Sequence, residues 1–313
     1  RPSAAAPADR PGPARSVPVR VLENAPAKGE IHEIVLLAPA GWGPVHAGQF
    51  IQLECPPREL FGLRRPFSLS GCRERPDGVE LRIVYGAIGQ RTRALAAVRA
   101  GAELEMVGPL GRPFSLPAGR RPVMIGGGRG IAPVLMLARQ WCGGRPDALL
   151  LYGARTAAQL LPLGPVPCEL LTATEDGSAG FRGTLLDLLE RLRAGGRIRE
   201  GEDALFACGP NAMLAALASW VEGRDLPCEV SLETQFGCGT GICAGCAVPV
   251  RGRPAARGAG QEVPHEAGHG ARQAGSQDTG GGRPATDFDR YVFACREGPV
   301  FPAEIVEWEG LHE

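Results

Sequence analysis

Four cysteines in the C-terminal part of the 313-residue chain have a spacing that suits coordination of a metal centre. Cys238 and Cys243 are separated by four residues, Cys243 and Cys246 by two, and Cys295 follows much later. This is the plant-type spacing with which four thiolates hold a [2Fe–2S] cluster. Four glycines among the three clustered cysteines allow tight turns and aim backbone N–H groups at sulfur. The sequence therefore predicts a [2Fe–2S] site on these four thiols.

Two other interpretations of these cysteines stay open at this point. A zinc ion is the stronger of the two, although zinc ribbons use two Cys-x2-Cys pairs and only one pair here has that spacing. Free core cysteines are the weaker, because three cysteines among four glycines would pack poorly. The assignment of Cys295 as the fourth ligand requires that the chain folds back across the 48 residues that separate it from Cys246. Closing a longer loop adds only about 0.6 kcal/mol per doubling of its length, so these two residues can still meet.

Two motifs in the first third of the chain suit a phosphate-bearing ligand with a flat ring. Arg65-Pro66-Phe67-Ser68 offers a permanently charged guanidinium for a pyrophosphate, an aromatic ring for stacking and a hydroxyl for a polar ring edge. Gly89-Gln90-Arg91-Thr92 opens a short helix with a glycine turn and a hydroxyl cap, a common anion site. Either motif alone is also compatible with ordinary strand or helix structure.

Two further turns follow strands in the middle of the chain. Gly126-Gly127-Gly128-Arg129-Gly130 lies between a short apolar strand and an apolar helix, where glycines let a nucleotide approach the backbone. It is not a strict G-x-G-x-x-G, and a tight packing turn is the alternative. Cys208-Gly209-Pro210 ends a later strand, and ligands bind at the carboxyl ends of such strands.

The elements that position these motifs change in kind along the chain. Short alternating strands broken by Gly and Pro indicate an antiparallel β-barrel over residues 17–118. Strands alternating with helices, including 131–141, 184–192 and 211–221, indicate a parallel-sheet α/β domain over residues 119–227. A small C-terminal domain, residues 228–313, would carry the cysteines. The fold class is thus α/β plus β.

Composition excludes some partners and predicts two segments without regular structure. Lys plus Arg and Asp plus Glu each number 34, so net charge gives no reason to expect nucleic acid or a membrane as partner. No apolar run reaches the roughly 18–20 residues of a membrane span, and no secretory signal is recognisable, so we expect a cytoplasmic protein. Residues 1–16 are predicted to be a disordered tail, and residues 251–286 a disordered insertion.

Taken together, the motifs resemble the ferredoxin–NADP reductase superfamily in order and spacing. The motifs are Arg65–Ser68, Gly89–Thr92, Gly126–Pro133, Thr174–Ser178 and Cys208–Pro210. The cysteine segment, with Ser231-Leu232-Glu233 before it and Arg296–Phe301 after it, is similar to the electron-transfer subunits of NAD-linked, B-type dihydroorotate dehydrogenases. One departure is Phe67, where many superfamily members have Tyr.

This resemblance implies cofactors and the residues that hold them. FAD would be held in the barrel by Arg65, Pro66, Phe67, Ser68, Val84, Tyr85, Gly86, Arg91 and Thr92. NAD, as substrate, would be received by Gly126, Gly127, Gly128, Gly130, Cys208, Gly209 and Pro210. The cluster ligands would be Cys238, Cys243, Cys246 and Cys295. No residue of this chain is predicted to act as a catalytic acid or base.

The resemblance also implies a function within a larger enzyme. Electrons would run from an FMN-containing dihydroorotate dehydrogenase catalytic subunit, through the cluster and FAD, to NAD in pyrimidine biosynthesis. The two kinds of subunit would form a heterotetramer. An NAD(P)H-dependent reductase subunit of another complex, such as a hydrogenase, a sulfite reductase or a bifurcating transhydrogenase, is the alternative. A zinc-stabilised nucleotide-binding module is the non-enzyme alternative.

Overall fold

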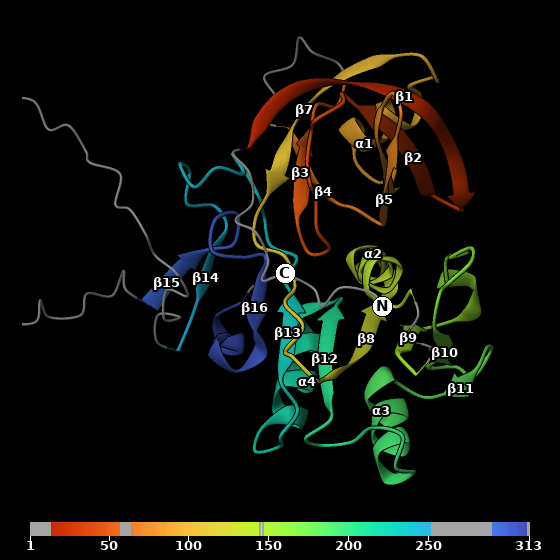
Figure 1. Ribbon diagram of the computed structural model, residues 1–313, viewed down its shortest axis with the longest axis vertical. Coiled ribbons are helices and arrows are strands. Elements are labelled where there is room, and N and C mark those ends of the chain that lie inside the picture. The colour runs from red at the N-terminus through yellow and green to blue at the C-terminus, as the bar shows by residue number, and fades with distance from the viewer. Residues whose placement is uncertain (1–13, 57–63, 144, 146, 252–289, 312–313) are drawn as a thin grey trace, which may run out of the picture.

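The computed structural model describes residues 14–56, 64–143, 145, 147–251 and 290–311. Two seven-stranded sheets make up most of the molecule, and a two-stranded sheet lies beside them (Figure 1). The predicted disorder of residues 1–13 and 252–286 falls outside the described residues. Arg251, at the edge of that segment, is described and donates its N–H to the carbonyl of Ile305.

The first sheet is antiparallel and has the strand order β4-β3-β7-β1-β2-β6-β5. It curves into a half-barrel, with the short helix α1 beside it (Figure 1). Its strands and helix are β1 (Arg15–Lys28), β2 (Ile31–Ala38), β3 (Phe50–Leu53), β4 (Arg65–Ser68), β5 (Gly71–Arg75), β6 (Gly78–Gly86), α1 (Gln90–Ala96) and β7 (Glu103–Leu110).

Two details of this sheet differ from the sequence prediction. The order ends at β4 and β5, so the described strands form an open half-barrel rather than a closed barrel. Pro66, which has no N–H to donate, lies in the edge strand β4, where a missing ladder bond is tolerated. At the other boundary, Arg15 and Ser16 were predicted in the disordered tail but pair with Gly108 and Val107.

The second sheet has the order β11-β10-β9-β8-β12-β13-β16 and is parallel except at β16. Helices between its strands confirm the α/β prediction. Its elements are β8 (Arg121–Gly127), η1 (Gly128–Gly130), α2 (Ile131–Trp141), β9 (Leu149–Ala154), η2 (Ala157–Gln159), β10 (Glu169–Thr174), β11 (Phe181–Arg182), α3 (Leu185–Ala194), β12 (Asp203–Cys208), α4 (Asn211–Val221), β13 (Cys228–Ser231) and β16 (Val300–Pro302).

In the described part of residues 228–313, two strands belong to the α/β sheet rather than to a sheet of their own. Its first strand, β13, pairs with β12, and its last, β16, pairs antiparallel with β13, so both belong to the α/β sheet. Among the strands of the described segment, only the antiparallel pair β14 (Ala247–Pro249) and β15 (Tyr291–Phe293) forms a sheet of its own. Two short 3-10 turns, η4 (Ala303–Ile305) and η5 (Trp308–Gly310), end the described chain.

Helix α2 connects the two large sheets. It lies between the half-barrel and the α/β sheet (Figure 1), and eight of its residues are buried. The hydrophobic cluster around it includes Leu36 and Leu81 from the half-barrel and Met124 and Phe206 from the α/β sheet. Because one apolar core is shared, the relative position of the two sheets is set by side-chain packing.

A buried ion pair stabilises the amino ends of β8 and β12. Asp203 is fully buried, and its carboxylate accepts hydrogen bonds from Arg121 Nε at 2.8 Å and Nη2 at 2.7 Å. The backbone N–H of Arg199 donates to the same carboxylate at 2.7 Å. The hydrogen bond with Asp203, the largest influence, raises the pKa of Arg121. Both charges are therefore compensated where solvent is excluded.

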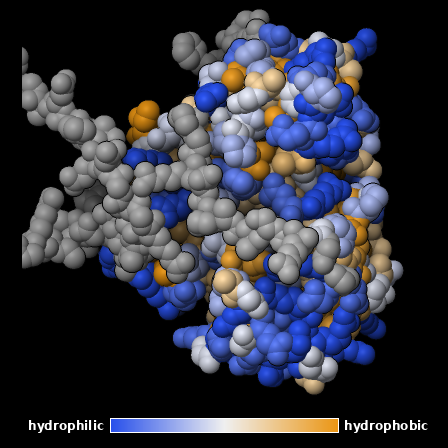
Figure 2. Space-filling view, in the orientation of Figure 1, coloured by the Kyte–Doolittle hydropathy of each residue, from blue (hydrophilic) through white to orange (hydrophobic). Residues whose placement is uncertain are grey.

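The surface gives no sign of a membrane-crossing helix. Within the described ranges, no helix is long and apolar enough to cross a bilayer. Figure 2 shows hydrophilic residues spread over one face, with apolar residues scattered among them.

Candidate flavin and iron–sulfur sites

The four predicted ligand cysteines form two pairs. In the first pair, the N–H of Cys238 points at Cys243 Sγ and the N–H of Cys243 at Cys238 Sγ, each at 3.4 Å. In the second, the N–H of Cys295 points at Cys246 Sγ at 3.5 Å. A [2Fe–2S] cluster requires two protein ligands on each of two irons, and two neighbouring pairs of thiols suit that requirement.

The hairpin of β14 and β15 explains how Cys246 meets the distant Cys295. Ala247 pairs with Phe293, and the N–H of Ala294 donates to the carbonyl of Cys246 at 2.9 Å. The register of these strands places the residue before β14 beside the residues that follow β15. The long intervening segment therefore does not prevent the two cysteines from meeting.

Backbone N–H groups surround the outer pair of sulfurs. The N–H groups of Thr240 and Ile242 point at Cys238 Sγ at 3.4 and 3.3 Å, beside that of Cys243. Hydrogen bonds from Thr240, followed by smaller contributions from Cys243, lower the pKa of Cys238 to about 5. Burial, then the neighbouring Cys246, raises the pKa of Cys295 to about 12. The donors around Cys238 favour a thiolate, the form in which cysteine binds iron.

Neither pair of cysteines is by itself a complete site for a single metal ion. Among the residues that the structure describes, no three Cys, His, Asp or Glu side chains converge on one point as ligands of one ion do. A structural zinc site needs four ligands in a tetrahedron around one centre.

A cleft between the two large sheets collects the residues of the predicted flavin site. Its lining is contributed by β4 and β6 of the half-barrel, by the start of α2, and by the segment that leads into the cysteine loop. The lining residues are Phe50, Pro66, Phe67, Ser68, Val84, Tyr85, Gly86, Arg129, Ala132, Pro133, Leu232, Glu233, Thr234, Phe236 and Pro299.

Aromatic side chains shape the half-barrel side of this cleft. The half-buried ring of Phe67 meets the ring of Tyr85 edge to face, with centroids 5.8 Å apart. Tyr85 is buried and its hydroxyl donates to Asn24 Oδ1 at 2.9 Å. Burial, the largest influence, raises the pKa of Tyr85 to about 12. Its side chain therefore serves the half-barrel core, which leaves its backbone for contact with a ligand.

Three predicted flavin residues do not line the cleft. Burial, the largest influence, raises the pKa of the Cys55 thiol to about 11. Arg65 and Arg91 both lie close enough to Cys55 for their positive charges to oppose that rise. Arg91 also donates to the carbonyl of Cys55 at 3.0 Å. Two guanidinium groups near one point suit a pyrophosphate. Thr92 instead caps α1, since its hydroxyl accepts from the N–H of Gly89 at 3.0 Å.

The sequence analysis named Ser231-Leu232-Glu233 in the family resemblance but assigned no flavin contact to the opposite wall of the cleft. Leu232, Glu233, Thr234 and Phe236 follow β13 at its carboxyl end, where ligands bind in parallel sheets. Their position after a strand could have indicated a ligand contact. That inference requires knowing that β13 belongs to the α/β sheet. Arg129 belongs to the glycine turn that is predicted to receive NAD, and it also lines the predicted flavin cleft.

The two turns predicted to receive NAD lie side by side. Pairing of β8 with β12 sets Gly126 opposite Cys208. A Cβ on Gly130 would lie 2.5 Å from the backbone of Cys208 and Gly209, and one on Gly209 would lie 3.1 Å from Gly127 Cα. Cys208 itself is buried, and burial followed by the nearby Glu233 raises its pKa.

Replacing Gly130 with alanine should open this pair of turns. The added methyl group meets backbone atoms that cannot move aside, so we expect a loss of about 1–3 kcal/mol in the free energy of unfolding. NAD affinity should fall as well. Chemical denaturation and nucleotide titration measure the two effects. Gly143→Ala, where the same methyl group meets open space, is the control, and equal stability of the two variants would contradict the prediction.

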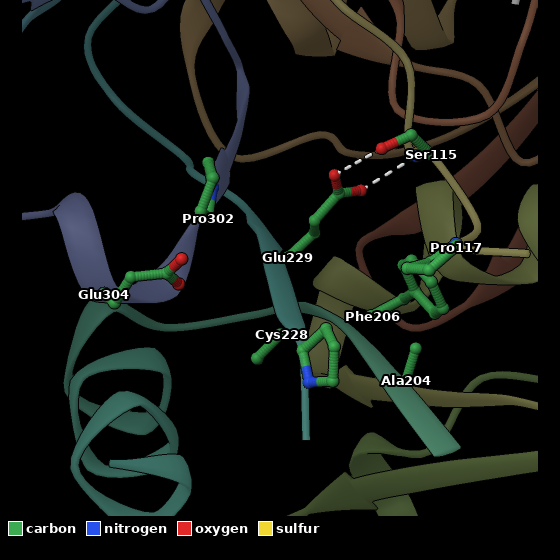
Figure 3. Close-up of a pocket in the computed structure, with 9 residues that line it drawn as sticks. Ser115, Pro117, Ala204, Phe206, Cys228, Glu229, Pro302 and Glu304 are labelled. Carbon is green, nitrogen blue, oxygen red and sulfur yellow. Dashed lines mark hydrogen bonds between the residues drawn. The ribbon is translucent and has the colours of Figure 1, made fainter. Parts of the chain in front are cut away.

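A second cavity lies at the opposite ends of β12 and β13, away from the predicted motifs. Figure 3 shows Glu229 turned toward Ser115, which precedes the α/β sheet. The Ser115 N–H and hydroxyl donate to the Glu229 carboxylate at 2.8 and 2.6 Å. Cys228 and Glu304 also line this space. The contact anchors the segment between the two sheets to β13.

Comparison with known proteins identifies the family. No family model matches the chain. The dihydroorotate dehydrogenase B (NAD(+)) electron transfer subunit of Desulforamulus reducens is 32% identical over 267 residues, 84% of this chain and 87% of the relative. That of Caldanaerobacter subterraneus subsp. tengcongensis is 31% identical over 291 residues, 92% and 96% of the two chains.

A solved structure supports the fold over the same length. The NADH-dependent reduced ferredoxin–NADP oxidoreductase, studied for flavin-based electron bifurcation, has a TM-score of 0.70 at 24% identity, and the match covers 93% of this chain and 90% of that one. At that identity the likeness concerns the fold alone. From the two curated relatives, matched over most of their length, we conclude that this chain belongs to the family of dihydroorotate dehydrogenase B (NAD(+)) electron transfer subunits.

Proposed function

We propose that this chain carries electrons from an FMN-containing dihydroorotate dehydrogenase catalytic subunit to NAD, through a [2Fe–2S] cluster and FAD. The observation that carries the proposal is the cleft between the sheets. Its wall at Phe236 is two residues from Cys238, so the predicted flavin and cluster sites adjoin. The proposal includes a heterotetramer with the catalytic subunit, a role in pyrimidine biosynthesis and a cytoplasmic location, in which ten cysteines without a disulfide are expected.

Residues from both sheets would hold the flavin. Arg65 and Arg91 would bind its pyrophosphate, while Phe67 and Ser68 would contact the ring system, with the backbone of β6 at Val84–Gly86 beside it. Thr92 would act by fixing the start of α1. NAD would enter at the turns Gly126–Gly130 and Cys208–Pro210.

The chain's own groups prepare the site for electron transfer. FAD supplies the exchange between hydride transfer at NAD and single-electron transfer at the cluster. Backbone N–H groups around Cys238 and Cys243 stabilise negative charge on sulfur. Apolar and aromatic side chains, including Phe50, Phe67 and Phe236, line the cleft and offer a flat ring system an apolar surface.

The test uses the chain purified with its co-expressed dihydroorotate-oxidising partner. We expect one FAD and two irons per chain, and NAD reduction that depends on dihydroorotate. Absence of flavin or of iron would refute the proposal. If the cofactors are present and dihydroorotate gives no NADH, the chain serves another NAD(P)H-linked complex.

Replacing Phe67 with alanine should weaken flavin binding by up to about tenfold, since aromatic contacts contribute about 0.5–1.5 kcal/mol beyond area burial. Fluorescence titration of the flavin-free chain with FAD measures this. Phe67→Tyr keeps the ring and should bind FAD with nearly the wild-type affinity. Equal affinity in the alanine variant would show that the ring makes no stacking contact.

A further inference from the structure

Gln52 is a buried polar residue at the junction between the half-barrel and the cysteine loop. Its side chain is 2% exposed. Neither Gln52 Oε1 nor Gln52 Nε2 has a hydrogen-bond partner within the part of the chain that the structure describes. Folding a carboxamide out of water without partners costs free energy, so a buried group of this kind requires an explanation.

The alternation of β3 directs Gln52 toward the cysteine loop. Ile51 and Leu53 point into the shared core around α2, whereas Phe50 belongs to the other hydrophobic cluster. Gln52 is two residues from Phe50 and so lies on the same face of the strand. On that face, the ring of Phe50 packs against Phe236 with centroids 4.8 Å apart.

The carboxamide meets the loop at Gly239. A Cβ on Gly239 would lie 2.5 Å from Gln52 Nε2 and 2.7 Å from Gln52 Cγ. Gly239 also has a φ of +72°, a conformation that favours glycine. The loop thus passes directly over Gln52 between Cys238 and Thr240. Across β3 and β4, Gln52 pairs with Pro66, which lines the flavin cleft.

A second buried glutamine of the half-barrel, Gln49, has hydrogen-bond partners for both ends of its carboxamide. Gln49 is fully buried. Its Nε2 donates to the carbonyl of Gly111 at 3.1 Å, and its Oε1 accepts from the N–H of His46 at 2.9 Å. Three residues further on, Gln52 has the same chemistry without such partners. Its partner is therefore to be sought in the cysteine loop that it faces.

We infer that Gln52 is a positioning residue for the iron–sulfur cluster, and that its Nε2–H donates to the cluster's sulfur atoms. The inference rests on the proposed function, because it requires the cluster. Cluster sulfurs accept hydrogen bonds and do not donate, so the NH2 group of the carboxamide that meets the loop is the end that would turn toward them. A donor favours the more negative, reduced cluster, so Gln52 raises its reduction potential.

The test replaces Gln52 with methionine in the loaded complex and measures the cluster potential by an EPR-monitored redox titration. We expect reduction of the cluster to become less favourable by about tenfold, which is about 59 mV to lower potential for a one-electron couple. Gln49→Met is the matched control and should leave the potential unchanged. An unchanged potential in Gln52→Met overturns the inference.

A second measurement does not depend on how well a variant folds. Wild-type protein with 15N only in glutamine side-chain amides should show nitrogen coupling to the reduced cluster in pulsed EPR. Absence of that coupling overturns the inference while the proposed function stands. A wild-type complex without iron would instead refute the proposed function.

A second variant, Gln52→Glu, keeps an acceptor and loses the donor. The reduction potential of the cluster should therefore fall in this variant as well.

Discussion

Replacing Cys295 with alanine should remove the cluster and stop electron transfer from the partner subunit. Cys295 is buried, 3% exposed, and its neighbour Cys246 would be left as the sole ligand of its pair. Loss of a residue that hydrogen-bonds to a metal ligand lowers metal affinity or activity by about 10–100-fold, and loss of a ligand itself should lower them further. We therefore expect dihydroorotate-driven NAD reduction to fall by more than about 100-fold, with iron content near zero.

The same variant should keep activities that do not need the cluster. NADH-driven reduction of a dye acceptor would use the proposed flavin cleft and nucleotide turns, which consist of other residues. Cys228→Ala is the matched control, because Cys228 is also buried, 4% exposed, and lies outside the cysteine loop. Full iron content in Cys295→Ala would show that the fourth ligand is a different residue.

Replacing Asp203 with alanine should destabilise the α/β sheet by about 3–5 kcal/mol, the usual cost of removing one partner of a buried ion pair. Arg121 would lose two hydrogen bonds from its guanidinium while its side chain stays only 13% exposed. The N–H of Arg199 would lose its acceptor as well. Chemical denaturation followed by circular dichroism measures the change.

The neighbouring ion pair provides a matched control for this prediction. Arg120 contacts Asp225 at 2.8 Å, but Asp225 is 65% exposed. Removing an exposed partner costs about 0–1 kcal/mol, because water screens the charges and replaces the lost contact. Asp225→Ala should therefore unfold close to wild type. If both variants lost the same stability, burial would not be the cause.

The strongest local patterns were enough to predict much of the architecture. Helices α2 and α4 begin and end at the predicted residues, 131–141 and 211–221, because a turn rich in Gly or Pro precedes a continuous apolar segment in each. The family membership inferred from motif order is confirmed by the curated relatives. The function that the motifs implied is the function of those relatives.

Short strands were where the sequence prediction was weakest. The three residues of β16 carry no recognisable period, and their partner strand β13 lies about 70 residues earlier. The C-terminal segment was therefore predicted as a separate domain, although β13 and β16 extend the α/β sheet. Likewise, nothing local distinguishes a half-barrel from a closed barrel, because closure depends on pairing between the edge strands β4 and β5.

The cysteine site shows most clearly which features the sequence predicts and which depend on the tertiary structure. Residue type and spacing alone predicted that Cys238, Cys243 and Cys246 bind one cluster, since a segment of nine residues keeps them near one another. Only the tertiary structure showed that Cys295 lies beside Cys246, through the register of β14 with β15, and that Gln52 faces the loop from another sheet. Contacts between distant segments depend on how whole sheets pack, and no local pattern encodes that packing.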